Sequence, residues 1–191
     1  MANRTSSRTK RAEVHVALLR GINVGGKHML PMKQLAAMFT DAGCGDVQTY
    51  IQSGNVVFRA GPALARRVPA LITAAIADRF GFDAPVMTRT AEDLRRVTRQ
   101  NPFLRSGTDT AALHVAFLAD EPARASVATL GPARGLPDEF VVRGREIYLR
   151  FPNGLARSRL TTAYFDSRLE TTITVRNWRT VVALLELATG R

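Results

Sequence analysis

The chain has 191 residues, which is enough for one compact unit or two small ones. Its hydrophobic content of 46% supports a packed core, and no apolar run is long enough to cross a membrane. The single cysteine, Cys44, excludes an intramolecular disulfide framework, and residues 1–11 lack the apolar segment of a signal peptide. We therefore expect a cytoplasmic protein with no membrane partner.

The chain is strongly basic, with a formal net charge of +11. Such a charge is typical of nucleic-acid-binding proteins. However, arginines outnumber lysines by 24 to 3, which indicates a compositional bias towards arginine rather than a dedicated binding face. Four of the basic residues lie within residues 1–12, where we expect a disordered basic tail. A nucleic acid is therefore an alternative partner that the charge alone does not favour.

Hydrophobic periodicity and turn signals divide the first half of the chain into alternating strands and helices. One helix begins near Pro31 and ends at Gly43, and the next begins near Pro69, because proline is poorly tolerated inside a helix. Thr90 is a typical N-cap, with acidic residues in the turn that follows it. The predicted order is strand, helix, strand, strand, helix, strand and helix, over residues 14–20, 31–43, 47–52, 56–59, 69–81, 85–89 and 90–100.

The second half repeats this order after a polar break at residues 105–109. Each half has a histidine near the start of its first strand and an arginine directly before the residue that caps its last helix. Any α+β chain alternates in this way by chance, but the matching hairpins and caps favour a duplication. The corresponding elements fall at residues 113–118, 122–131, 140–143, 146–151, 160–169, 172–176 and 177–188.

These patterns predict an α+β fold made of two tandem ferredoxin-like (βαββαβ) repeats. The repeats would cover residues 13–103 and 112–191, with a linker at 104–111. We expect mainly antiparallel sheets with helices packed on one face.

The most informative local motif is a glycine-rich loop, residues 21–27, which follows the first strand and ends at Lys27. Bare backbone N–H groups beside a lysine form a natural anion site. The spacing matches most of a phosphate-binding P-loop, but His28 stands where that motif needs Ser or Thr to hold Mg²⁺, so an NTPase is not favoured. The alternative is a tight turn that needs glycine for positive φ and leaves Lys27 in solvent.

Three further segments combine polar and basic residues. The 52–55 turn adds polar groups that a hairpin does not require, and residues 152–159 form a basic loop before a helix. Arg176 and Asn177 precede Trp178, and their alternative role is a helix cap beside a core tryptophan. The histidines and Cys44 do not have the spacing of a metal site, and no nucleophile with an activating base is recognisable. No metal is therefore predicted, and the cofactor and any catalytic residue stay unknown.

Several of these segments together resemble the bacterial domain-of-unknown-function family 1697, namely residues 16–27, 52–58, 101–103, 152–160 and 176–187. The patterns ALLRGINVGGK, QSGNVVF and RNW carry the resemblance, which extends over nearly the whole chain after the tail. The resemblance implies a duplicated ferredoxin-like α+β protein and implies no activity or cofactor. His28 is the best general-base candidate, but the family pattern does not require histidine there, which argues against a catalytic role.

We hypothesise that the protein binds a small anionic or phosphate-bearing ligand in a cleft between the 21–27 loop and the 52–55 turn. Basic side chains would neutralise the charge of the ligand, glycine N–H groups would approach it, and polar side chains would orient it. The candidate ligand-binding residues are Arg20, Asn23, Gly25, Gly26, Lys27, Gln52, Ser53, Gly54, Asn55, Arg157, Arg176 and Asn177.

Two other classes of function stay open. A nucleic-acid-binding module would stack bases on exposed sheet aromatics, for which the strands offer Tyr50, Phe58 and Tyr148. A structural or interaction protein would use the same loops only to shape the fold. The sequence does not determine the oligomeric state or whether the protein is an enzyme.

Overall fold

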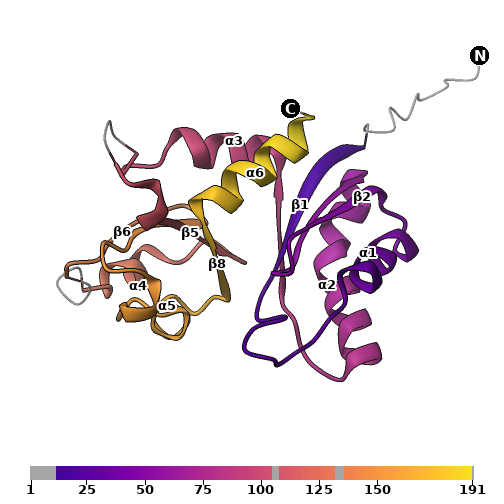
Figure 1. The fold of residues 1–191 in the computed structure, drawn as a ribbon, viewed down its shortest axis with the longest axis horizontal. Coiled ribbons are helices and arrows are strands. Elements are labelled where there is room, and N and C mark those ends of the chain that lie inside the picture. Colours follow the sequence, from indigo (N-terminus) through magenta and orange to yellow (C-terminus); the bar gives the residue numbers. More distant parts are fainter. Residues whose placement is uncertain (1–11, 105–107, 132–135, 191) are drawn as a thin grey trace, which may run out of the picture.

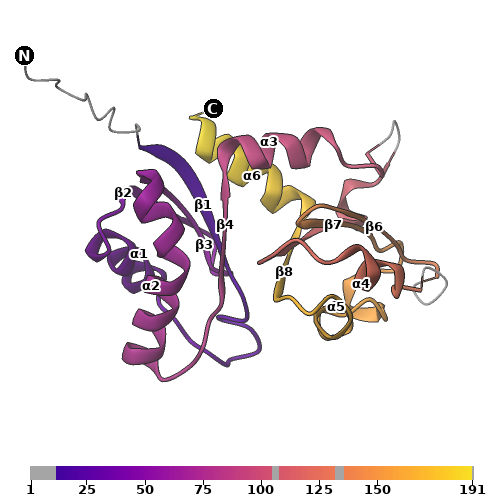
Figure 2. The same ribbon diagram turned by 180° about the vertical axis from the view of Figure 1, so that it is seen from behind.

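The computed structural model describes residues 12–104, 108–131 and 136–190. Within them the chain forms an α+β fold with two four-stranded antiparallel sheets, one from each half (Figures 1 and 2). The expected basic tail lies outside these residues except for Ala12, and the expected linker lies partly outside them. No helix in these ranges has the length and apolar character that a membrane span requires.

The first sheet has the strand order β2-β3-β1-β4, with every neighbouring pair antiparallel. Helices α1 (Met32–Asp41) and α2 (Pro62–Phe80) cover one of its faces (Figure 1). Residues along the first strand alternate between the faces, so that Leu19 packs towards these helices and Leu18 towards the opposite side. The strands are β1 (Glu13–Leu19), β2 (Gly45–Tyr50), β3 (Asn55–Ala60) and β4 (Val86–Thr90).

The second sheet has the strand order β6-β7-β5-β8 and is also antiparallel. Helices α4 (Arg124–Ala128) and α5 (Thr162–Leu169) lie on its outer side, with 3₁₀ turns η1 (Thr110–Ala112) and η3 (Leu155–Arg157) in the connections. The two orders correspond strand for strand, because β5 takes the inner position that β1 has in the first sheet. The strands are β5 (Leu113–Leu118), β6 (Glu139–Arg143), β7 (Glu146–Arg150) and β8 (Ile173–Asn177).

The inner faces of the two sheets are buried between the halves. Leu18 of β1 and Phe117 of β5 belong to one apolar cluster, together with residues of α3 (Ala91–Arg99) and α6 (Trp178–Thr189). These two helices pack against each other above the junction of the halves (Figures 1 and 2). Each sheet is therefore buried on both faces, whereas the sequence pattern indicated helices on one face only.

Two predicted helix starts are confirmed by their hydrogen bonds. The Thr90 hydroxyl oxygen accepts from the Asp93 N–H (3.0 Å), and the Asp93 carboxylate accepts from the Thr90 N–H (2.9 Å), which is a capping box. The side-chain oxygen of Asn177 accepts from the Thr180 N–H (2.8 Å). Both caps hold their helices at the end of the last strand of a half.

The predicted start of the second helix near Pro69 is wrong. The helix α2 begins at Pro62, a first-turn position where the missing N–H has no intrahelical acceptor, and it continues through Pro69. An interior proline costs about 3 kcal/mol. Tertiary packing offsets this cost, since each buried aliphatic side chain contributes about 1.5–3 kcal/mol. The buried residues of α2 are Val68, Ile72 and Ile76.

Candidate functional site

The 21–27 loop is a tight hairpin rather than a cradle at the start of a helix. The Lys27 N–H donates to the Val24 carbonyl (3.0 Å), and the Asn23 N–H donates to the His28 carbonyl (3.1 Å). Gly25 and Gly26 form the tip at φ values of 57° and 73°, which only glycine adopts readily. Because α1 starts only at Met32, the loop lacks the helix N-terminus that a P-loop places under its phosphates.

Asn23 joins this hairpin to the 52–55 turn. Its side-chain N–H₂ donates to the Gln52 carbonyl (2.9 Å) and to the Leu30 carbonyl (3.0 Å), while its oxygen accepts from the Leu30 N–H (2.8 Å). Gly54 lies so close to β1 that an added Cβ would stand 2.7 Å from the Leu19 Cβ. The structure thus brings together the loop and the turn that the sequence singled out, and glycine is required where they meet.

The two cations of the loop have different surroundings. The Arg20 guanidinium lies 2.6 Å from the carboxylate of Asp166 in α5, so its charge is neutralised by the second half. Lys27 is exposed and has no carboxylate partner within the described residues. Of these two cations, Lys27 is therefore the one whose charge no carboxylate of the described residues pairs at the hairpin.

Arg176 is buried and binds to the protein itself. From β8 it donates to the carbonyls of Leu19 (2.7 Å), Ser53 (3.0 Å) and Gly54 (3.3 Å), and its Nε–H donates to the side-chain oxygen of Asn55. Its remaining N–H groups donate within β8. Burial lowers the pKa of Arg176 to about 10, so it stays charged at neutral pH. With every N–H group used, Arg176 positions the 52–55 turn and has no donor left for a ligand.

Arg89 makes the same contacts in the opposite direction. From β4 it donates to the carbonyls of Leu118 (2.8 Å) and Arg145 (2.9 Å) and forms a buried ion pair with Glu146 (2.7 Å). These acceptors correspond to those of Arg176, because each set contains the last residue of an inner strand and the residue directly before β3 or β7. In each half, the arginine of the last strand therefore extends into the other half and binds there. The sequence showed both arginines but not this exchange.

The other predicted site residues lie apart from the hairpin. Asn177 is used as the cap of α6, and Arg157 is exposed in η3. No hydrogen bond or ion pair within the described ranges joins either residue to the 21–27 loop. The Ser53 hydroxyl accepts from the Asn55 side chain (2.9 Å), which fixes the turn but pairs Ser53 with no base.

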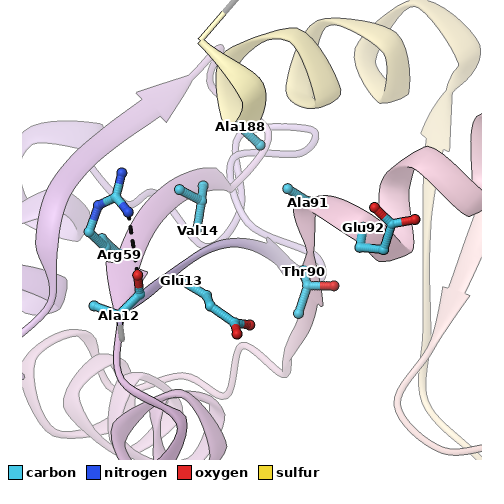
Figure 3. A pocket seen from close by; sticks show the side chains of 8 residues that line it. All are labelled: Ala12, Glu13, Val14, Arg59, Thr90, Ala91, Glu92 and Ala188. Atoms are coloured by element: carbon cyan, nitrogen blue, oxygen red, sulfur yellow. Dashed lines mark hydrogen bonds between the residues drawn. The ribbon is translucent and has the colours of Figure 1, made fainter. Parts of the chain in front are cut away.

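Two surface pockets lie near the junction of β1 and α3. A pocket of about 400 Å³ opens between the start of β1, the start of α3 and the end of α6 (Figure 3). Figure 3 shows that Glu13 and Glu92 face it as well as Arg59, whose guanidinium donates to the Ala12 carbonyl (3.4 Å). This mixture of charges does not select an anion.

A neighbouring pocket of about 260 Å³ has a different lining, which includes His15, Arg66 and Arg145. No pattern in the sequence marks these residues as a group, since they are far apart in the chain and only the fold brings them together. Neither pocket is lined by the 21–27 loop. In residues 12–104, 108–131 and 136–190 no cluster of three or more His, Cys, Asp or Glu side chains could hold a metal ion.

Comparison with known proteins supports the fold and the family. A search of solved structures finds the conserved bacterial protein SP0830 from Streptococcus pneumoniae, with a TM-score of 0.66 and 22% identity over 93% of this chain and 99% of that one. At this identity the likeness shows the fold alone. No curated protein matches the chain. The family model described as "Protein of unknown function (DUF1697)" matches residues 13–148, and the chain therefore belongs to this family.

Proposed function

We propose that the protein binds a small anionic or phosphate-bearing ligand at the tip of the 21–27 hairpin, beside the 52–55 turn. The observation that carries this proposal is the unpaired charge of Lys27 next to free backbone donors. The N–H groups of Gly25 and Gly26 donate to no acceptor within the described residues, and both glycines are exposed. Lysine and bare N–H groups together are a common anion-binding arrangement.

The candidate residues divide into two roles under this proposal. Lys27 and the two tip glycines contact the ligand, and the side chain of Gln52 orients it. Asn23 and Arg176 act as positioning residues, because their hydrogen bonds hold the hairpin and the turn in place. The same role applies to Gly54 and Asn55, while Arg157 and Asn177 have no part in the site.

We also propose that the two halves, residues 13–103 and 112–191, are ferredoxin-like repeats that arose by duplication. Their strand orders correspond, and the reciprocal contacts of Arg89 and Arg176 relate equivalent atoms. The buried free thiol of Cys44 supports a reducing compartment such as the cytoplasm.

The nucleic-acid alternative receives less support. Phe58 and Tyr148, on which bases would stack, are 0% and 1% exposed, and Tyr50 is half-buried against the apolar cluster between the halves. Base stacking requires an accessible aromatic face. We therefore keep a short RNA only as one arm of the test.

The test is a thermal-shift screen of nucleotides, sugar phosphates, inorganic phosphate and a short RNA. A ligand at about 100 times its Kd stabilises a protein by about 2.7 kcal/mol. We expect a phosphate-bearing compound to stabilise the wild type and the Lys27→Gln variant to lose most of that effect. Lys33→Gln is the matched control, because Lys33 is an exposed lysine on α1. A stabilising compound that acts equally on both variants would refute binding at the hairpin, and an inactive panel would favour the structural or interaction protein.

A further inference from the structure

A second pocket, separate from the hairpin, has the features of an anion site. It lies beside β4, the edge strand of the first sheet, where α2 and α3 begin, and Arg145 reaches it from the second half. Its volume of about 260 Å³ admits a phosphate group with a small organic substituent. Binding at this pocket does not require the proposed function of the hairpin.

His15 supplies the first observation. It lines this pocket, is only 8% exposed, and its Nε2 is buried without a hydrogen-bond partner. Its ring stacks on Phe58 with 5.4 Å between the centroids, which fixes the imidazole in place. A buried nitrogen without a partner is costly and rare in native proteins. His15 Nε2 itself has no surface open to the pocket, so a bound ligand would supply the missing partner after a small shift of the ring.

The charges around the pocket supply the second observation. Arg66 and Arg145 line it, and neither has a carboxylate partner in the described part of the chain. Asp93 also lines the pocket, but it pairs with Arg96 (2.7 Å), and Glu146 pairs with the buried Arg89 (2.7 Å). Arg66 and Arg145 therefore bring two positive charges to the pocket that pair with no carboxylate among the described residues.

The helix starts add to this charge. The 19-residue helix α2 begins at the pocket with Pro62, and its N-cap Gly61 makes no side-chain capping bond. Pro62 has no N–H and the Ala65 N–H donates to the Gly61 carbonyl (2.9 Å), so the helix contributes the positive end of its dipole, which favours an anion. Thr90, the cap of α3, also lines the pocket.

The geometry points to a binding site for a small oxyanion, inorganic phosphate or a small phosphomonoester, held by Arg66, Arg145 and His15 at the start of α2. The two arginines donate to the oxyanion, and a small shift of the imidazole ring gives the buried His15 Nε2 its missing partner. Thr88 lines the pocket and offers a hydroxyl group to the same ligand, whereas the Thr90 hydroxyl already donates to the Asp93 carboxylate (2.8 Å).

The test uses the three histidines as separate reporters in the full-length protein. Imidazole ¹H–¹⁵N signals are followed by NMR while inorganic phosphate is added at constant ionic strength. His15 reports on the second pocket, His28 on the hairpin, and His114 of β5 lies in neither. We expect a saturable shift of the His15 signal with no shift of His114.

Two sets of variants complete the experiment. The double variant Arg66→Gln/Arg145→Gln should raise the phosphate Kd at His15 by about tenfold or more, as expected for the loss of charge-assisted hydrogen bonds. Arg67→Gln is the matched control, because Arg67 is exposed on α2 but does not line the pocket. It should change the Kd by less than about twofold, since a solvated charge outside the site is screened. Far-UV circular dichroism checks that each variant is folded.

Three results would overturn the inference. The first is a His15 signal that phosphate does not move. The second is a shift confined to His28, which would support the hairpin site instead. The third is an equal loss of binding in the Arg67→Gln control, which would show that phosphate responds only to the general charge of the protein.

Discussion

Replacement of Arg176 tests whether the exchange of arginines holds the two halves together. Methionine at this position keeps an unbranched side chain but removes all five N–H donors. Leu19 and Gly54 each keep another donor, from the Thr174 hydroxyl and the Leu19 N–H. The Ser53 carbonyl and the Asn55 side-chain oxygen lose the donor that the structure gives them.

The magnitude follows from these two orphaned acceptors. Each buried acceptor without a donor costs about 1–3 kcal/mol, or about 2–6 kcal/mol together. Part of this cost is offset, because the variant no longer buries a guanidinium that has no carboxylate beside it. We therefore expect Arg176→Met to lower the free energy of unfolding by about 2–4 kcal/mol.

Urea denaturation with linear extrapolation measures this difference. Arg179→Met is the control, since Arg179 is exposed on α6, the helix that directly follows β8, and its effect should stay within about 0.5 kcal/mol. A loss below about 0.5 kcal/mol for Arg176→Met would refute the reasoning. It would mean that dehydrating the guanidinium costs as much as its hydrogen bonds contribute.

Three further predictions follow from the packing. Arg89→Met should lower the free energy of unfolding by about 3–5 kcal/mol, because it leaves the buried Glu146 carboxylate unpaired. Adding Glu146→Leu to this variant should restore most of the lost stability. A double variant as unstable as the single variant would contradict the ion-pair argument. Gly54→Ala should cost at least about 1 kcal/mol more than Gly26→Ala in the same denaturation experiment. Both have positive φ, but only at Gly54 would the new Cβ meet atoms at 2.7 Å, so equal losses would argue against the close contact. Burial lowers the pKa of His15 below its ordinary 6.5. The stability that neutral His15 contributes is therefore complete above about pH 6.5 and is lost as the pH falls below it. His15→Phe should flatten the slope of unfolding free energy against pH below about pH 6.5, and an unchanged slope would contradict this.

The order of the elements and several of their ends could be predicted because they depend on neighbouring residues. The capping box of Thr90 and Asp93 and the cap at Asn177 are read from adjacent side chains, and both are confirmed. The family was also recognisable from short patterns, and the match over residues 13–148 confirms it. The helix start near Pro69 was wrong because local propensity cannot account for the tertiary burial that keeps α2 continuous.

Part of the candidate site was also visible in the sequence. The 21–27 loop and the 52–55 turn stood out by their glycines and polar residues, and Asn23 joins them in the structure. The roles of the cations were not visible, because Arg20 is neutralised by Asp166 from the other half and the donors of Arg176 are used on buried carbonyls. Charge and spacing along the chain do not show which cations meet an acceptor after folding.

The sequence by itself determined the local structure of this protein, since caps, turns and the alternation of apolar residues act over a few positions. Only the tertiary structure decided which surfaces are exposed. Both faces of each sheet are covered, and the side chains of Arg89 and Arg176 bind in the opposite half. His15, Arg66 and Arg145 line one pocket only in the folded chain. These outcomes depend on how the two halves pack against each other. The buried charges of Arg89 and Arg176 find their partners, Glu146 and Asn55, more than fifty positions away in the chain.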